Sequence, residues 1–142
     1  MRTAIDTNVI SALWSAEPLS RDLPEILEEA ASAGGLVICA PVYAELHAHP
    51  KVTTVFIDEF LAATGIAIDF DLGKPVWREA SIRFAKYASR RRGSRGGGAK
   101  RLLADFMIGA HALIRADRLL TLDTTRYAKD FPELDLIECG GA

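Results

Sequence analysis

Short apolar runs alternate with longer amphipathic segments along the whole chain of 142 residues. The clearest run is Leu36-Val37-Ile38-Cys39-Ala40, which follows two glycines and precedes Pro41. A run that is apolar at every position is typical of a strand covered on both faces, because a half-exposed strand would alternate apolar and polar residues. Strands of this kind, separated by helices, predict an α/β fold with a central parallel sheet flanked by helices.

The rest of the pattern predicts four more strands, at about residues 4–5, 66–70, 119–122 and 134–137. Helices are expected at about 9–14, 22–34, 41–49, 53–64, 75–88 and 102–115, with a short one from residue 124. A chain of this length fits one domain with a single core, so we expect residues 1–142 to form one unit.

The composition excludes several classes of protein. Hydrophobic residues make up 49% of the chain and charged residues 25%, as in ordinary globular domains and unlike disordered segments. No apolar run has the length of a signal-peptide core or a membrane span, so we expect a cytoplasmic protein without a membrane partner. The two cysteines, Cys39 and Cys139, predict no disulfide framework or zinc motif. Because the net charge is only -2, a nucleic-acid partner would need a local basic patch.

Asp6 stands where the first predicted strand ends, and Thr7 or Asn8 can cap a helix that begins at Val9. In an open parallel sheet, ligands bind at the carboxyl ends of the strands, so this carboxylate is placed to hold a cation or a phosphate-bearing substrate. Asp, Thr and Asn are also common capping residues, and this stretch alone does not separate capping from catalysis.

Three further acids have contexts that point to the same edge of the sheet. Asp105 is the one carboxylate in the apolar helix expected at 102–115, where a buried charge needs a cation, hydrogen bonds or water, although an acid in the first turn could serve only the helix dipole. Glu45 lies one turn into the helix after the second strand and, alone, would fit a solvated surface residue. Asp123 follows the predicted strand at 119–122 and, alone, would fit a helix cap. In a parallel sheet these acids and Asp6 can all face one crevice.

These acids and their surroundings resemble the motifs of the PIN-domain family. In chain order, the matching elements are Asp6-Thr7-Asn8 after the first strand, Glu45 after the second, Asp105 within 104–112, and Thr121-Leu122-Asp123 near the end. The resemblance covers almost the whole chain and is strongest to the VapC-type toxins of toxin-antitoxin pairs. It implies a three-layer sandwich around a parallel sheet and a Mg²⁺- or Mn²⁺-dependent endoribonuclease with an RNA substrate. It also implies frequent homodimers and inhibition by a small antitoxin protein.

By residue, the resemblance casts Asp6, Glu45 and Asp105 as catalytic metal ligands and Asp123 as a looser fourth acid, often in contact through water. Asn8 is then the polar neighbour that orients the site. The chemistry agrees independently, because hard carboxylate oxygens suit Mg²⁺ or Mn²⁺, which neutralise phosphodiester charge and activate water. No Ser-His-Asp or Cys-His arrangement competes as a nucleophilic site.

A basic, glycine-rich stretch from Arg90 to Arg101 precedes the helix that carries Asp105. Its glycines and like charges predict a loop. We expect this loop to grip the RNA backbone without taking part in the chemistry, through Arg91, Arg92, Arg95, Lys100 and Arg101. A solvated loop, or one that contacts the antitoxin, is the alternative.

The histidines and tryptophans favour structural roles. His111 is expected in the core, and His49, before a proline, is expected to mark a helix end. Trp14 and Trp77 fit the core or an interface better than a base-stacking platform.

Three other functions are less well supported by the sequence. A signalling receiver domain needs a lysine near the end of its last strand, and residues 134–138 contain none. A phosphatase with an aspartyl nucleophile needs Asp-x-Asp after the first strand, where this chain has Asp6-Thr7-Asn8. A non-catalytic RNA-binding or interaction module on the same fold is the main alternative, although such a module has no need of four acids that repel one another without metal.

Overall fold

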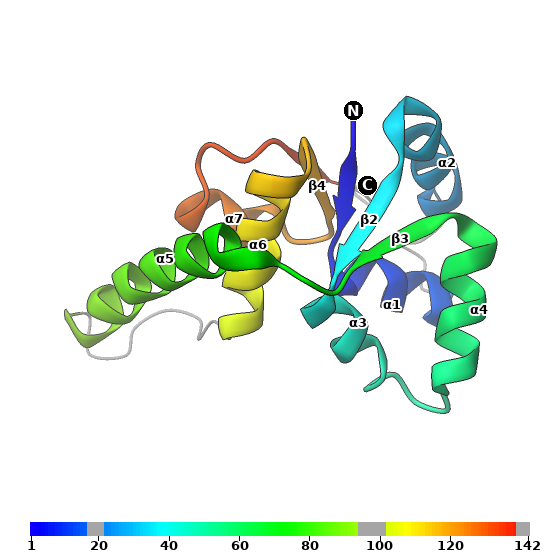
Figure 1. Cartoon of the computed structure of the whole chain (residues 1–142), viewed down its shortest axis with the longest axis horizontal. Coiled ribbons are helices and arrows are strands. Elements are labelled where there is room, and N and C mark those ends of the chain that lie inside the picture. Colours follow the sequence, from blue (N-terminus) through cyan, green and yellow to red (C-terminus); the bar gives the residue numbers. More distant parts are fainter. Residues whose placement is uncertain (17–21, 94–101, 139–142) are drawn as a thin grey trace.

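The computed structural model describes residues 1–16, 22–93 and 102–138 (Figure 1). The strands within these ranges are β1 (Thr3–Ile5), β2 (Leu36–Cys39), β3 (Ile66–Asp69), β4 (Arg118–Thr121) and β5 (Leu136–Glu138). Every neighbouring pair is parallel, and the strand order is β3-β2-β1-β4-β5. The predicted α/β fold with a central parallel sheet is therefore confirmed.

Helices cover both sides of this sheet. They are α1 (Thr7–Ser15), α2 (Leu23–Gly34), α3 (Ala40–Leu46), α4 (Thr54–Thr64), α5 (Gly73–Gly93), α6 (Leu103–Arg115) and α7 (Thr124–Asp130). Helices α1, α2 and α4 lie on one side and α5, α6 and α7 on the other (Figure 1). The side changes because the chain runs from β1 outward to β3, returns to β4 and continues outward to β5, and parallel crossovers are right-handed. The result is a three-layer sandwich.

The strand order reverses between β1 and β4, which are direct neighbours. Ile5 pairs with Leu120, and the backbone N–H of Asp6 donates to the carbonyl of Leu120 over 3.0 Å. From this point β1 continues into α1 on one side of the sheet, while β4 continues into α7 on the other. Such a reversal at the carboxyl ends of parallel strands is where open α/β sheets bind their ligands.

The core follows the apolar runs of the sequence. All four residues of β2 are buried, as its uninterrupted apolar run predicted. On the other side, Phe106 of α6 packs against Phe131, and both rings are fully buried. A Cβ atom on Gly109 would lie 2.4 Å from the ring of Phe131, so the close approach of α6 to this ring depends on a glycine there.

Most predicted bounds agree with the structure to within a few residues, and four expectations differ from it. Helix α1 begins at Thr7 and not at Val9, because Asp6 itself is the cap and accepts a hydrogen bond from the Thr7 backbone N–H. The helix after β2 ends at Leu46, short of the predicted residue 49. Trp77 is 54% exposed, so it does not belong to the core.

The fourth difference concerns the basic stretch that the sequence predicted to be a loop. Helix α5 continues through Gly93, so the beginning of this stretch is helical. Arg90 forms an ion pair with Asp130 of α7, whose side chain is only 3% exposed. This contact with a distant part of the chain extends the helix beyond the point where like charges and glycines predict its end. Residues 94–101 of the stretch lie outside the described residues.

Further expectations concern a buried histidine, the two cysteines and membrane-spanning segments. His111 is 1% exposed and pairs with Asp69 Oδ2 over 2.8 Å, so its predicted place in the core is confirmed. Cys39 is a free, buried thiol, and Cys139 lies outside the described residues. Within the described part of the chain, no helix combines the length and the apolar character that crossing a membrane requires.

Candidate active site

Asp6 lies at the end of β1, beside the end of β4. Its Oδ1 accepts a hydrogen bond from the Thr7 backbone N–H and its Oδ2 accepts one from the Thr121 hydroxyl, each over 2.8 Å. The residue is 4% exposed. Burial raises the pKa of Asp6 to about 6, against the opposing hydrogen bonds from Thr121, Tyr127 and Thr7, and the charge of Asp105 adds to the rise. A carboxylate in this state gains from a nearby cation.

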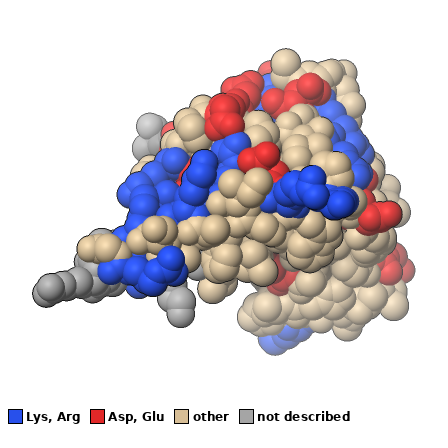
Figure 2. All heavy atoms as spheres, turned by 60° about the vertical axis from the view of Figure 1, so that its left-hand side comes forward, with Lys and Arg blue, Asp and Glu red and all other residues tan. Residues whose placement is uncertain are grey.

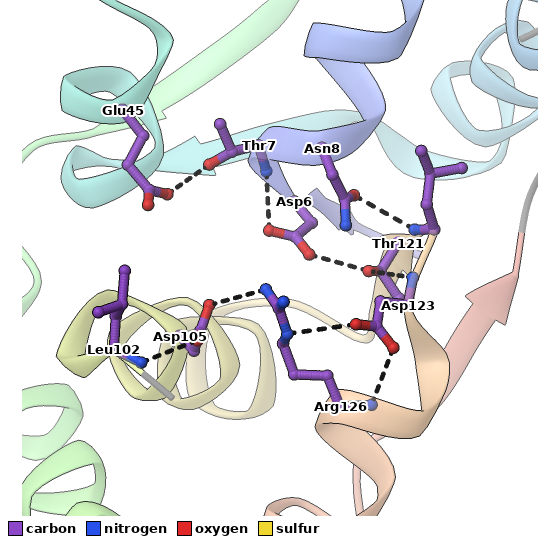
Figure 3. A network of polar contacts seen from close by, with 10 residues as sticks. Asp6, Thr7, Asn8, Glu45, Leu102, Asp105, Thr121, Asp123 and Arg126 are labelled. Carbon is purple, nitrogen blue, oxygen red and sulfur yellow. Dashed lines mark hydrogen bonds and ion pairs between the residues drawn. The ribbon is translucent and has the colours of Figure 1, made fainter. Parts of the chain in front are cut away.

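Glu45 comes to this place on α3, which begins directly after β2 and has Pro41 in its first turn. Its Oε1 accepts a hydrogen bond of 2.6 Å from the hydroxyl of Thr7. Thr7 therefore contacts two acids at once, Asp6 through its backbone N–H and Glu45 through its side chain (Figure 3).

Asp105 lies in the first turn of α6 and is 8% exposed. Its Oδ2 accepts a hydrogen bond of 3.2 Å from the Leu102 backbone N–H, which stabilises the start of the helix. Its Oδ1 is 3.4 Å from a guanidinium nitrogen of Arg126. One oxygen of Asp105 thus serves the helix end, while the other faces the guanidinium of Arg126.

Asp123 caps α7 by accepting a hydrogen bond of 3.1 Å from the Arg126 backbone N–H, so its expected capping role is confirmed. Its own backbone N–H donates to Thr121 Oγ1 over 3.0 Å, and Thr121 thereby links Asp123 to Asp6. Asn8 Oδ1 accepts a hydrogen bond of 3.2 Å from the Leu122 backbone N–H, which ties α1 to the segment after β4.

Asp6, Glu45, Asp105 and Asp123, which we call the acidic cluster, therefore lie around one polar network (Figure 3). An arginine completes the network. Arg126 Nε is 3.2 Å from Asp123 Oδ2, and its guanidinium lies between Asp123 and Asp105 in Figure 3. Arg126 was not predicted from the sequence, although an aspartate and an arginine three residues apart at a helix start are a recognisable pair. Thr121 was part of the matching element Thr121-Leu122-Asp123, but the sequence assigned no role to its hydroxyl, which contacts both Asp6 and Asp123.

The donor set of the acidic cluster fits a hard divalent ion, because every side-chain donor is a carboxylate oxygen. The Asp6 carboxylate has four lone pairs, and the hydrogen bonds from Thr7, Thr121 and Tyr127 leave at least one of them for a metal ion. Among the described residues, no three His, Cys, Asp or Glu side chains are already close enough to hold a metal ion. A shared ion would therefore require the carboxylates to draw together.

The basic residues expected to contact RNA divide into two groups. Arg91 and Arg92 lie in the last turn of α5, while the other three, Arg95, Lys100 and Arg101, lie outside the described residues. Lysines and arginines gather on the face that α5 and α7 share (Figure 2). This face carries a groove of about 250 Å³, which we call the basic groove. Its charged lining residues are four cations, Arg83, Lys86, Arg90 and Lys129, and three acids, Glu79, Asp130 and Glu133. Arg83 pairs with Glu79 and Glu133, and Arg90 pairs with Asp130.

The chain is similar to known proteins in its sequence profile and in its fold. The profile of the PIN domain family matches residues 3–132. The structure of VapBC2 from Rickettsia felis bound to a DNA fragment from their promoter contains a chain of similar fold, with a TM-score of 0.72, 20% identity, and coverage of 97% of this chain and 98% of that chain. The structure of VapBC-1 from nontypeable Haemophilus influenzae contains another similar chain, with a TM-score of 0.64, 20% identity, and coverage of 97% of this chain and 98% of that chain. The structure of FitAcB from Neisseria gonorrhoeae contains a third, with a TM-score of 0.58, 19% identity, and coverage of 96% of this chain and 96% of that chain. No curated protein sequence matches the chain.

Proposed function

Since the chain belongs to the PIN-domain family, whose members are generally nucleases that use divalent metal ions, we propose that it is a metal-dependent endoribonuclease. We further propose that it acts as the VapC-type toxin of a toxin-antitoxin pair and works as a homodimer. The proposal rests on the acidic cluster, whose members come from four separate segments of the chain and lie around one polar network where the strand order reverses. Similarity in fold to chains of VapBC and FitAB complexes supports the toxin role.

In this proposal Asp6, Glu45 and Asp105 hold Mg²⁺ or Mn²⁺, with Asp123 as a looser fourth acid, and the bound ion supplies charge neutralisation and an activated water. The hydrogen bonds from Thr7 and Thr121 fix the plane of the Asp6 carboxylate, so the orientation of this carboxylate is fixed for a metal ion. Thr7 keeps Glu45 beside Asp6, since it donates to both. Asn8 orients the site by holding the backbone that leads to Asp123.

Electrostatics explains why basic residues belong to the same proposal. An acidic cluster repels a polyanion, so the RNA backbone needs cations outside the cluster. We assign this role to Arg91 and Arg92 of α5 together with Arg95, Lys100 and Arg101, which follow them in the sequence. Contacts to phosphates position the RNA and carry no sequence information.

A small antitoxin is the proposed partner, and the acidic cluster is its proposed target. Carboxylates that already accept a guanidinium from within the chain have the chemistry to accept an arginine from another protein. A co-purified partner should protect the backbone amides around Glu45 and Asp105 from hydrogen exchange. Tight binding without protection there would place the inhibitory contact elsewhere.

Cleavage of RNA by purified variants tests the proposed activity. Wild-type protein should cleave RNA with Mg²⁺ or Mn²⁺ and stop when the metal is chelated. Loss of a residue that only supports metal ligands typically costs about 10–100-fold, so Asp6→Asn and Asp105→Asn should each lose at least about 100-fold. Asp123→Asn should lose less, on the order of tenfold.

Asp22→Asn is the matched control for these variants, because it removes the same charge from the start of α2 and leaves a capping residue there. This variant should cleave at the wild-type rate. An Asp105→Asn protein as active as wild type would show that the metal ligands are wrongly assigned. If the wild-type protein binds RNA but neither cleaves it nor binds Mn²⁺, the non-catalytic RNA-binding module becomes the better account of this fold.

A further inference from the structure

Arg126 occupies an unusual position, because it is a cation inside the acidic cluster. It lies in the first turn of α7 and contacts Asp123 of its own helix end over 3.2 Å and Asp105 of α6 over 3.4 Å. Figure 3 shows its side chain between the two carboxylates. The arginine thus bridges two acids that the proposed function assigns to a metal ion.

The two contacts use the oxygens that a metal ion would need. Asp105 Oδ2 accepts the Leu102 backbone N–H, and Arg126 faces Oδ1. Asp123 Oδ1 accepts the Arg126 backbone N–H, and the Arg126 side chain faces Oδ2. In each acid, one oxygen holds a helix end and the other faces the guanidinium. A divalent ion and the guanidinium would therefore compete for the same two atoms.

The geometry of the contacts suits an exchangeable pair. The distances of 3.2 and 3.4 Å are long for charge-assisted hydrogen bonds, and the Arg126 side chain is 41% exposed. Ion pairs with this exposure contribute little net stability, because water screens them. By contrast, Arg83 of α5 holds Glu79 at 2.7 Å with a side chain that is only 13% exposed.

We propose that Arg126 is an exchangeable counter-cation of the acidic cluster, an inference that rests on the proposed function. In the metal-free protein its guanidinium pairs with Asp105 and Asp123 and offsets their repulsion. When a divalent ion binds, the guanidinium leaves both carboxylates and binds a phosphate of the RNA backbone. Arginine suits both states, since its planar fork binds carboxylate and phosphate oxygens alike.

The surroundings of Arg126 support the second state. Lys129 follows it by three residues on α7 and lines the basic groove together with Lys86. Arg83 and Arg90 of this groove pair with its acids, so the positive charge that follows Arg126 here is that of Lys129 and Lys86. An RNA backbone that leaves the cluster past Arg126 would meet these lysines next.

Titration calorimetry with Mn²⁺ alone tests the competition. Three proteins are compared: wild type, Arg126→Gln, and the matched control Lys129→Gln, which removes the same charge from the exposed side of the same helix. Arg126→Gln should bind Mn²⁺ roughly three- to tenfold more tightly than wild type, since two weak ion pairs no longer compete with the metal. Lys129→Gln should stay within about twofold of wild type. Arg126→Lys, which keeps the charge and loses the fork, should lie between wild type and Arg126→Gln.

Two outcomes would overturn the inference in distinguishable ways. If all the proteins bind Mn²⁺ equally, or if Arg126→Gln binds it more weakly, Arg126 does not compete with metal and the proposed function still stands. If none of them binds Mn²⁺, the proposed function fails and the inference fails with it. Melting temperatures provide a check on folding, because Arg126→Gln should melt below Lys129→Gln without metal and the difference should shrink with saturating Mn²⁺.

Binding of a 2′-O-methylated RNA oligonucleotide, which resists cleavage, tests the second state. With Mn²⁺ present, Arg126→Gln should lower the salt dependence of RNA binding by about one unit of slope, the value for one lost phosphate contact. In the presence of a chelator the slope should equal that of wild type, because the guanidinium is then occupied by the carboxylates. Equal changes with and without metal, or no change in either, would contradict the exchange.

Discussion

Two regions of this molecule place carboxylates against arginines, and they do so in opposite ways. In the first, where α5 packs against α7 and the segment before β5, Arg83 holds Glu79 and Glu133 at 2.7 and 3.0 Å, and Arg90 pairs with the buried Asp130. We call this region the paired region. In the acidic cluster, four acids lie around one network, and Arg126 contacts two of them at 3.2 and 3.4 Å.

The pKa values express this difference. Hydrogen bonding to Arg83 lowers the pKa of Glu133 to about 2, whereas burial raises the pKa of Asp6 to about 6. The first value means that the folded protein favours the charged acid, and the second means that it disfavours it. The paired region therefore stabilises the fold. In the acidic cluster, buried negative charge lowers the free energy of unfolding, and a bound cation would offset this loss.

The largest effect that separates the regions is on stability without metal. Removing one partner of a buried ion pair typically costs about 3–5 kcal/mol, and because Arg90 is 41% exposed the loss for Asp130→Asn should be about 1–3 kcal/mol. Asp6→Asn removes a buried charge and should leave the free energy of unfolding unchanged or higher. Urea unfolding at pH 7 with a chelator measures both. An equal loss of unfolding free energy in the two variants would show that the two regions do not differ in this way.

The second effect concerns the basic residues next to the paired region. Arg90 is already engaged by Asp130, so the RNA contact is expected from its neighbours. Replacing Arg91, Arg92 and Arg95 with Ala should weaken binding of all RNAs alike and reduce the salt slope by about one unit for each lost contact. Turnover at saturating RNA should change little.

A matched control removes cations from the other end of the same helix, through Lys74→Ala and Arg78→Ala. This control should keep the wild-type salt slope. If the slope of the triple variant is also unaltered, the arginines at the end of α5 serve the antitoxin or the solvent instead of RNA.

The smallest effect comes from a third arrangement, the pair of Asp69 and the buried His111. Burial lowers the pKa of His111 even though Asp69 opposes this shift. Burial alone would raise the pKa of Asp69. The hydrogen bond from His111 and the charges of Arg2 and Arg115 outweigh burial and bring this pKa below its ordinary value. An unfolded histidine takes up a proton near pH 6.5 while the folded one resists, so the pair loses stability as the pH falls below about 6.5.

His111→Gln isolates this contribution, because glutamine keeps a hydrogen-bond donor and does not titrate. The stability of wild type relative to His111→Gln should fall by less than about 1 kcal/mol between pH 7.5 and 5.5. Urea unfolding at several pH values measures the difference. A difference that stays constant over this range would show that His111 and Asp69 do not couple folding to protonation.

The fold could be predicted from the sequence because its strands coincide with apolar runs. Each predicted strand of the described chain exists, and β2 is buried at every position. The positions of Asp6 and Asp123 after β1 and β4 followed from the same pattern, since parallel strands end at one edge. Their proposed roles as metal ligands stay predictions that the variants above test.

The features that the sequence did not predict depend on contacts between distant segments. Arg126 reaches Asp105 only because α6 and α7 come together over the fully buried rings of Phe106 and Phe131. The extension of α5 likewise depends on Arg90 meeting Asp130, which lies 40 residues away in the chain. Local rules on charge and glycine content carry no information about such partners.

The central claim is that the acidic cluster binds a divalent ion, and the most direct test is the melting temperature as a function of Mn²⁺ concentration. At ten times the dissociation constant, binding adds about 1.4 kcal/mol, so wild type should melt about 5 °C higher. Asp130→Asn should start lower and gain the full shift, whereas Asp6→Asn should gain much less. The account would be contradicted if Mn²⁺ left the wild-type melting temperature unchanged or raised that of Asp6→Asn by the same amount.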